Sequence, residues 1–299
     1  MLHALRQTEN VAASSAGIDT WPDADILQAL LEGQLHALMA IRPALPALAR
    51  AAEAVASRLR NGGKLYYAGA GTSIRIAVQD GTELPATFGI PEDQLRYLIA
   101  GGKDAIFETL ADKEDSIEDG AAAASACGQK DVLIAVAASG RTPYTIAAAK
   151  TARANGCFVV SVINVAHSEL GKAADVEVVL DSGAEVIAGS TRLGAGSAQK
   201  AALNLISTLV GIKLGGVHDG MMVAMRPENE KLKERAAGIV AKIANVPLDV
   251  ARKAMIEAGE IKPAILLCKG AKSLATAQEL LSGAGGNLRL ALARLNEKS

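Results

Sequence analysis

Five short aliphatic runs, separated by alanine-rich stretches with helical spacing, constrain the fold of this chain more than any other feature of its sequence. A strand that is apolar throughout, without alternating polar residues, is typical of a parallel sheet covered by helices on both faces. The expected strands are Lys64–Ala68, Leu95–Ala100, Asp131–Ala137, Phe158–Val165 and Val176–Leu180. The sequence therefore predicts a doubly wound parallel α/β domain over roughly residues 50–220.

Helices are expected before the first strand. Apolar residues at helical spacing predict one helix over residues 24–42 and another over 46–60, with Pro43 and Pro46 separating the two. The pair Gly62-Gly63 then ends the second helix.

Helices are also expected at the end of the chain, because the strand signals mostly stop after about residue 228. The expected helices are Glu228–Ile243, Leu248–Ala258 and Ser273–Leu281. The short apolar run Ala264–Cys268 could be a strand or a helix, and helix is the more economical interpretation. We therefore expect the α/β domain and its N-terminal helices within residues 1–227, and a small all-helical domain over 228–299.

The composition argues against several classes of protein. The 31 Lys and Arg residues balance 32 Asp and Glu residues, so the usual electrostatic case for a dedicated nucleic-acid binder is missing. No apolar stretch approaches the roughly 18 residues that suggest a membrane span, and the N-terminus lacks the apolar core of a signal peptide. Cys127, Cys157 and Cys268 are widely spaced, which predicts neither a disulfide framework nor a zinc site and favours a reducing cytoplasm.

Two expected strands each run into a loop of Gly, Ser and Thr residues and then into a helix. The first loop is Gly69–Ser73 and the second is Ala138–Thr142. In open α/β sheets, ligands bind beyond the carboxyl ends of the strands, where a helix N-terminus offers unpaired N–H groups. The two loops could hold a phosphate dianion without a cluster of lysines. The alternative is a pair of ordinary, well-capped turns.

Neither common nucleotide motif is complete in this chain. Ile74 occupies the third glycine position of Gly-x-Gly-x-x-Gly, and no Gly-x-x-x-x-Gly-Lys-Ser/Thr occurs. A third polar segment, from Glu185 to Lys200, precedes an apolar helix over Ala201–Leu214. This segment is either a capped helix start with Arg192 at the surface, or a further wall of the anion site with Arg192 or Lys200 reaching the ligand.

Several motifs together resemble a known family. They are Gly69–Ser73, Asp80–Gly89, Lys113–Ser116, Ala137–Tyr144, Gly189–Leu193 and Ala198–Lys200, with Thr8–Asn10 and Ile18–Asp19 near the start. The two loops resemble those of the sugar isomerase (SIS) fold, a flavodoxin-like three-layer sandwich. The whole set is similar to the N-acetylmuramic acid 6-phosphate etherases, relatives of the glucokinase regulatory proteins. The resemblance covers nearly the whole chain.

The chain also departs from this family at several positions. Ile74 stands where the family usually has Gly, Gly194 where it has Lys, and Ala224 where it has Asp. The segment Gly81–Ala86 differs from the usual Ala-Ser-Glu-Cys-Pro-Pro, although Glu83 and Pro85 are kept.

The resemblance implies cleavage of the ether that joins D-lactate to C3 of N-acetylmuramic acid 6-phosphate, within the recycling of peptidoglycan amino sugars. The implied route opens the sugar, removes the C2 proton, expels lactate and adds water, with no metal or redox cofactor. Glu83 and Glu114 match the catalytic pair: Glu83 would protonate the lactate oxygen and Glu114 would transfer the C2 proton. By residue pattern alone, Glu83 lies in an irregular segment before Pro85, and Glu114 in a solvated acidic helix start.

The resemblance also implies a set of residues that bind the phosphorylated amino sugar. Those matching the phosphate-binding loops are Gly71, Thr72, Ser73, Ser139, Gly140 and Thr142, followed by the further candidates Arg141, Ser190, Thr191 and Lys200. His218 is a candidate for opening the sugar ring, because a histidine near this region does so in related isomerases. SIS domains commonly dimerise through helices that flank the sheet, so a homodimer is expected.

Two other functions are compatible with the sequence. An aldose–ketose isomerase would need only ring opening and C2 proton transfer. A non-catalytic sugar-phosphate sensor, like the glucokinase regulatory relatives, is favoured by the departures at Ile74, Gly194 and Ala224.

Overall fold

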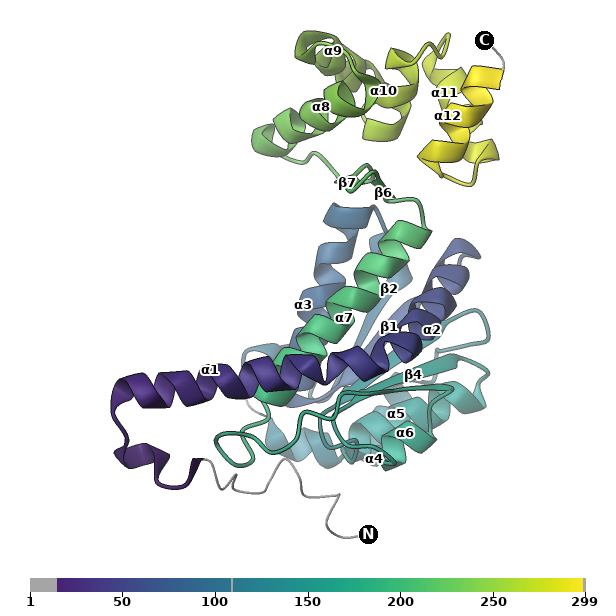
Figure 1. Ribbon diagram of the computed structural model, residues 1–299. Helices are drawn as coiled ribbons and strands as arrows, with labels where there is room; N and C mark the ends of the chain where they lie inside the picture. Colours follow the sequence, from purple (N-terminus) through teal and green to yellow (C-terminus); the bar gives the residue numbers. More distant parts are fainter. Residues whose placement is uncertain (1–14, 109, 298–299) are drawn as a thin grey trace. The chain divides into compact units, whose positions relative to one another are not determined.

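The computed structural model describes residues 15–108 and 110–297, so the motif Thr8–Asn10 lies outside the described residues (Figure 1). Packing divides the chain into two compact units. Unit 1 contains the described residues up to Gly81 together with Asp93–Ser207, and unit 2 contains Thr82–Glu92 together with the residues from Thr208 onward. These limits differ from the boundary expected after residue 227, which stays a prediction.

Unit 1 is built on a parallel sheet of five strands in the order β2-β1-β3-β4-β5. The strands are β1 (Leu65–Gly69), β2 (Leu95–Ile99), β3 (Val132–Ala137), β4 (Phe158–Ile163) and β5 (Val176–Val179). Leu65 lies opposite both Leu95 and Val132, and Val132 lies opposite Phe158. The expected strands are confirmed to within two residues at each end, and the strand order is that of the flavodoxin-like sheet.

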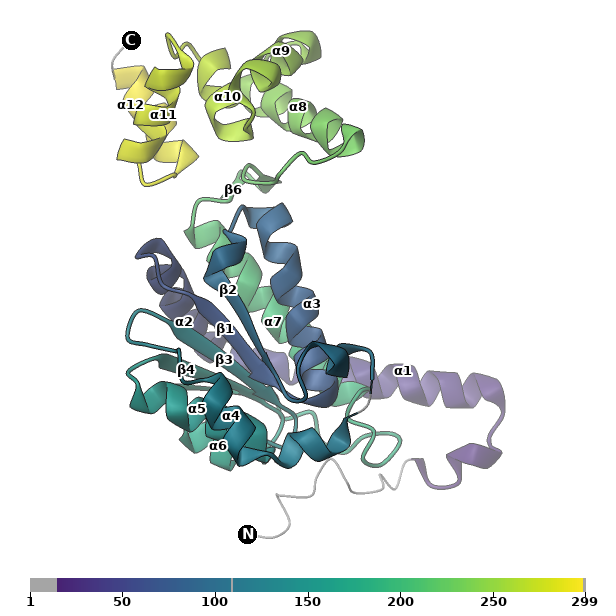
Figure 2. The same ribbon diagram turned by 180° about the vertical axis from the view of Figure 1, so that it is seen from behind.

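Helices cover both faces of the sheet, as expected for a three-layer sandwich (Figures 1 and 2). One face carries α2 (Ile41–Arg60), α3 (Gly71–Phe88) and α7 (Gly194–Lys213), and the other carries α4 (Ile117–Ala123), α5 (Pro143–Ala154) and α6 (Glu169–Lys172). All six residues of β3 are buried. This double coverage explains why β3 is apolar throughout, whereas the edge strands β2 and β5 carry Arg96 and Glu177.

The first two helices meet at Ala40 and not at the two prolines. Helix α1 spans Asp23–Met39, and α2 begins at Ile41. Pro43 lies in the first turn of α2, where a backbone N–H has no acceptor within the helix, so the missing donor costs little. The helix also continues through Pro46. The prediction that Pro43 and Pro46 separate the helices is therefore wrong.

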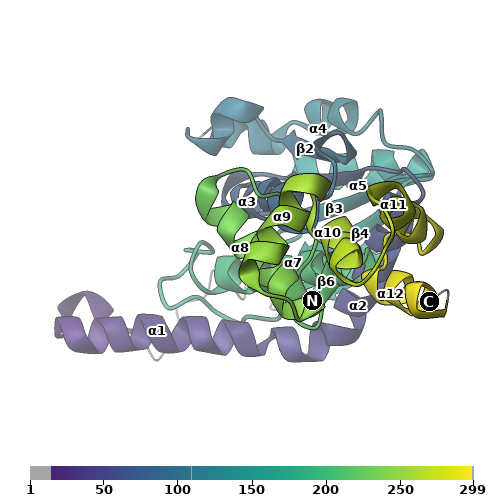
Figure 3. The same cartoon turned by 90° about the horizontal axis from the view of Figure 1, so that it is seen from above.

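Unit 2 is mostly helical (Figure 3). Its helices are α8 (Glu230–Ala244), α9 (Leu248–Ala258), α10 (Ile261–Cys268), α11 (Leu274–Gly283) and α12 (Leu288–Glu297). The expected helices are confirmed, and the ambiguous run is helical in α10. Helix α12 was not expected, and neither was the hairpin of β6 (Val217–His218) and β7 (Met221–Met222). The turn of this hairpin, Asp219-Gly220, has positive φ at both residues.

Across the part of the chain that the structure describes, no helix combines the length and the apolar content needed to cross a membrane.

Candidate active site

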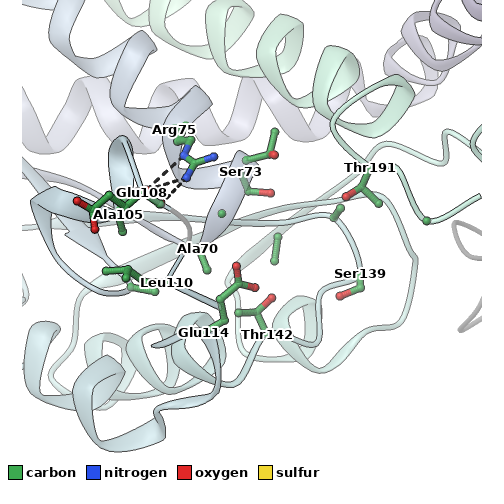
Figure 4. Close-up of a pocket in the computed structure, with 16 residues that line it drawn as sticks. Ala70, Ser73, Arg75, Ala105, Glu108, Leu110, Glu114, Ser139, Thr142 and Thr191 are labelled. Atoms are coloured by element: carbon green, nitrogen blue, oxygen red, sulfur yellow. Dashed lines mark hydrogen bonds between the residues drawn. The ribbon is translucent and has the colours of Figure 1, made fainter. Parts of the chain in front are cut away.

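A cavity of about 430 Å³ lies in unit 1, at the carboxyl ends of β1, β2 and β3 (Figure 4). The first loop contributes Ala70–Ser73, and the second contributes Ala138, Ser139 and Thr142. The two loops meet because β1 and β3 are neighbours in the sheet, although β2 separates them in the sequence. This reversal of strand order is the place where ligands bind in doubly wound sheets.

The first loop is tied to the interior by a chain of buried side-chain hydrogen bonds. The Ser73 hydroxyl donates to Oε1 of Gln199 at 2.9 Å, and the Gln199 amide donates to Oδ1 of Asn164 at 3.0 Å. Asn164 in turn donates to the carbonyl of Leu180 at 3.0 Å. Because a carbonyl can only accept, the direction of the whole chain is fixed. A phosphate bound at Ser73 must therefore compete with Gln199 for the hydroxyl proton.

The second loop depends on close packing of its backbone. Gly140 has a φ of 64°, and a Cβ at this position would lie 2.2 Å from Oγ of Ser168. Only glycine fits there. Thr142 precedes α5, whose first residue is Pro143, and lines the cavity together with Ser139. Arg141 is exposed and does not line the cavity.

Glu114 brings a carboxylate to the cavity. It belongs to a short 3-10 helix, Ala111–Asp115, in which the other two acidic residues are exposed and Glu114 alone is half-buried. Its Oε1 lies 2.9 Å from the position that a Cβ on Gly71 would occupy, so this approach requires glycine at 71. Burial raises the pKa of the Glu114 carboxyl; Asp115 adds to this rise and Arg75 opposes it. A half-buried carboxyl of raised pKa in a cleft is suited to proton transfer.

The third polar segment contributes to the cavity through Gly189 and Thr191 only. The N-terminus of α7 already holds an anion, because the buried carboxylate of Glu185 accepts hydrogen bonds from the N–H groups of Gly194 and Ala195, both at 2.9 Å. Three expected candidates do not line the cavity: Ser190, Arg192 and Lys200.

Arg75 also lines the cavity, although it was not among the expected site residues. Its guanidinium donates to the carbonyls of Ala105 and Glu108, which are lining residues as well. Arg75 lies four residues after Gly71 on α3, so it shares a helix face with the first loop. That spacing could have indicated Arg75 from the sequence.

Several known proteins whose sequences are similar to this chain share one name. The N-acetylmuramic acid 6-phosphate etherase of Symbiobacterium thermophilum is 44% identical over 261 residues, covering 87% of each chain. The protein of the same name from Deinococcus radiodurans is 41% identical over 290 residues, covering 96% of this chain and 95% of the relative. The chain belongs to the N-acetylmuramic acid 6-phosphate etherase family.

The domain matches and the fold agree with membership of the etherase family. The SIS domain matches residues 103–208, and the glucokinase regulatory protein N-terminal SIS domain matches residues 47–153. A phosphoheptose isomerase from Francisella tularensis has the same fold, with a TM-score of 0.50 and 18% identity, covering 64% of this chain and 100% of that chain.

Glu83 does not line the cavity, although its motif matches that of the etherase family. Helix α3 is continuous from Gly71 to Phe88, with Pro85 inside it, so the expected irregular segment before Pro85 is wrong. Pro85 lies near the C-terminal end of the helix, where it removes a single backbone hydrogen bond. Glu83 is exposed and belongs to unit 2, whereas the cavity lies in unit 1.

The departures from the etherase family do not change the lining of the cavity. Ile74 is fully buried and packs close to Gly69 of β1. A Cβ at Gly194 would lie 3.1 Å from Oε2 of Glu185, so this departure concerns the start of α7. Ala224 belongs to unit 2, where it packs next to Gly89.

His218 also belongs to unit 2 and is absent from the cavity lining. Its Nε2 lies 3.4 Å from Oδ2 of Asp219, and burial lowers the pKa of the imidazole. Within the described residues, no group of three or more His, Cys, Asp or Glu side chains is arranged to hold a metal ion.

Proposed function

We propose that this protein is a carbon–oxygen lyase that cleaves the D-lactyl ether of N-acetylmuramic acid 6-phosphate. The products are N-acetylglucosamine 6-phosphate and D-lactate. The observation that carries this proposal is Glu114, a half-buried carboxyl of raised pKa beside two loops suited to a phosphate. The proposal is also supported by the 41–44% sequence identity between this chain and proteins named N-acetylmuramic acid 6-phosphate etherase.

The phosphate binds between the two loops in this proposal. Thr72, Ser139, Thr142 and Thr191 offer hydroxyl groups, and the N-termini of α3 and α5 begin at the loops. Backbone N–H groups and the positive ends of the helix dipoles favour an anion at such a place. A dianion can therefore be held there without lysine.

Glu114 takes the C2 proton of the open-chain aldehyde. The electron pair of the C2–H bond is delocalised into the aldehyde, and the C3–O bond then breaks with the lactate oxygen taking a proton. Water adds its oxygen to C3 of the unsaturated aldehyde, a proton returns to C2, and the ring closes. We assign protonation of the lactate oxygen to Glu83 on the match of its motif to the etherase family alone.

The deciding experiment supplies N-acetylmuramic acid 6-phosphate in ¹⁸O-water and follows both products by mass spectrometry. Release of D-lactate with solvent oxygen at C3 of the sugar supports elimination followed by hydration. An aldose–ketose isomerase would release no lactate and would give a ketose phosphate. Saturable thermal stabilisation by the sugar phosphate without turnover would support the sensor. The three departures that favour a sensor lie outside the cavity lining.

We further propose that the protein acts as a homodimer. Leu27, Leu31 and Leu35 follow one another at four-residue spacing on α1 and are 67%, 53% and 53% exposed, which gives α1 an apolar stripe. A second copy of the chain is the partner that we expect on this stripe. Sedimentation of the wild type and of Leu31→Glu tests it, since the variant should shift toward monomer if α1 forms the interface.

We place the reaction in the cytoplasm, within the recycling of peptidoglycan amino sugars. The substrate is phosphorylated, and Cys127, Cys157 and Cys268 are free thiols, which fits a reducing compartment.

A further inference from the structure

Arg75 connects helix α3 to a segment on the other side of the cavity. Its Nε and Nη2 lie 3.2 and 3.0 Å from the carbonyl oxygen of Ala105, and Nη2 lies 2.7 Å from that of Glu108. The dashed lines in Figure 4 mark these hydrogen bonds. Among the described residues that line the cavity, Arg75 is the one with a positive charge. Its guanidinium group thus donates hydrogen bonds to backbone carbonyls that lie 30 and 33 residues away in the sequence.

Among its described residues, the segment that Arg75 holds contains one short 3-10 helix, Lys103–Ile106, and no longer element. Ala105, Glu108 and Leu110, called the cavity wall below, follow β2 and the pair Gly101-Gly102, which both have positive φ. The other hydrogen bonds described for residues 103–108 are local, such as those from Ala105 to Gly102 and from Glu108 to Asp104. Phe107, in the middle, is 91% exposed. Ala105 is buried and contributes packing, but among the hydrogen bonds described for this segment those that link it to α3 come from the fork of Arg75.

The cavity wall differs chemically from the loops that it faces. Figure 4 shows Ala105, Glu108 and Leu110 on one side, and Ser139 and Thr191 on the other. The loops offer hydroxyl groups, whereas the wall adds the aliphatic side chains of Ala105 and Leu110 and the carboxylate of Glu108. A sugar phosphate held by its phosphate at the loops would turn its remaining substituents toward the wall.

We propose that Arg75 is a positioning residue that anchors the cavity wall to α3 and thereby sets how tightly the sugar, as distinct from the phosphate, is bound. The sugar part of this inference rests on the function proposed above. Lysine cannot replace arginine in this role, because a single ammonium group cannot bond two carbonyls with the geometry of a planar fork. Arg75→Lys therefore keeps the charge and removes the fork, and Arg75→Met removes both.

The charge of Arg75 has a separate effect, which allows the two contributions to be distinguished. The charged groups that act on the pKa of Glu114 are Asp115 on its own element and Arg75 on α3. Glu108 lines the same cavity, and the exposed Asp112 and Lys113 belong to the same 3-10 helix as Glu114. Arg75 lowers the pKa of the Glu114 carboxyl, whereas burial and Asp115 raise it. Loss of the charge should therefore raise this pKa further, and loss of the fork alone should not.

The test measures amide hydrogen exchange of residues 103–108, together with the Kd of N-acetylglucosamine 6-phosphate and of inorganic phosphate. In Arg75→Lys, we expect exchange of the wall to be faster and the sugar phosphate to bind on the order of tenfold more weakly, with inorganic phosphate within about twofold of wild type. Arg75→Met should show the same changes, and its pH–rate profile should move to higher pH on the acidic side. Arg96→Lys is the matched control, because Arg96 bonds the carbonyl of Leu95 and does not line the cavity.

Two results would overturn the inference. Wild-type exchange of residues 103–108 in both Arg75 variants would show that the wall has another anchor. Equal weakening of phosphate and sugar phosphate would make Arg75 a phosphate ligand instead. Both measurements remain valid if the wild type releases no lactate, so failure of the proposed reaction and failure of this inference are separate outcomes.

Discussion

The two loops of the cavity look alike in the sequence and are held in place by different means. Each follows a buried strand, contains Gly, Ser and Thr, and precedes a helix. The first loop is fixed by side chains, through the hydrogen bonds from Ser73 to Gln199 and from Gln199 to Asn164. The second is fixed by its backbone, because Gly140 packs directly against Ser168 and its carbonyl accepts a hydrogen bond from the N–H of Leu170.

Two loops of similar sequence should therefore respond differently to substitution. Removing a buried side-chain partner leaves a donor or acceptor unsatisfied, at a cost of about 1–3 kcal/mol. Adding an atom to the second loop forces the backbone to move, because protein interiors have little free space. The first loop should therefore be sensitive to loss of polar groups, and the second to gain of volume.

The largest expected effect concerns the carboxylate that lies against the first loop. Glu114→Gln keeps the shape of the side chain and removes the base, so kcat should fall by about 10²–10⁴-fold, while the product N-acetylglucosamine 6-phosphate should still bind. The variant should also lose exchange of the C2 proton with solvent deuterium. Because the pKa of Glu114 is raised, wild-type activity should be lost as pH falls through a value above that of a free glutamate. Undiminished C2 exchange would assign the base to another residue.

Gly140→Ala tests the second loop. The added Cβ would lie 2.2 Å from Oγ of Ser168, at a φ of 64° that disfavours alanine. We expect the free energy of unfolding in urea to fall by about 3 kcal/mol. Gly238→Ala is the control, because nothing lies within 4 Å of its added Cβ in helix α8, and it should be neutral or slightly stabilising. If Gly140→Ala were as stable as the wild type, the backbone of the second loop could move to accommodate the added Cβ.

Gln199→Leu tests the first loop. It removes the acceptor of Ser73 and the donor to Asn164, both in the buried interior. The free energy of unfolding should fall by about 1–3 kcal/mol, because Ser73 and Asn164 each lose a buried hydrogen-bond partner. Ser125→Ala removes an exposed hydrogen bond to Ala122 and should change stability by less than about 0.5 kcal/mol. If the two variants were equally stable, the buried chain would not support the first loop.

The smallest expected effect is that of Ser139→Ala, which removes one hydroxyl from the second loop without adding volume. The KM should rise by roughly tenfold with kcat nearly unchanged, since a contact made in both ground and transition states is lost. Stability should stay near that of the wild type. Steady-state kinetics measure this change. An unchanged KM would show that the second loop does not bind the phosphate.

Local sequence patterns were sufficient for most of the fold. The strands are mostly apolar runs, most completely in β3, and they leave a clear signal because the sheet is covered on both faces. The predictions were wrong or incomplete where tertiary packing, and not the local residue pattern, sets the structure. Pro43 and Pro46 were expected to separate two helices, and the segment before Pro85 was expected to be irregular. Helix α2 nevertheless continues through Pro46, and Pro43 and Pro85 lie near helix ends, where the missing N–H costs little. The hairpin of β6 and β7 has two residues per strand, too few to show a period.

The candidate site was predicted less completely. The resemblance indicated Glu114, whereas its residue pattern suggested an exposed helix start, because burial depends on the loop folding against Gly71. Arg75 was missed because the loop motif was taken to end at Ser73, although Arg75 lies four residues after Gly71 on α3; its partners are backbone carbonyls, which carry no residue type of their own. Lys200 and Arg141 were included for their charge, and the fold leaves both exposed and outside the cavity lining.

Residue patterns alone predicted most of the strands and helices along the chain and the two Gly, Ser and Thr loops, because these depend on neighbours within a few residues. Which candidates share a cavity depends on contacts between distant segments. The strand order puts β1 beside β3 and brings together loops that are 69 positions apart, from residue 69 to residue 138. The same packing turns Arg75 and Glu114 toward that cavity and leaves Glu83 outside its lining, since burial and proximity arise only when distant segments pack together.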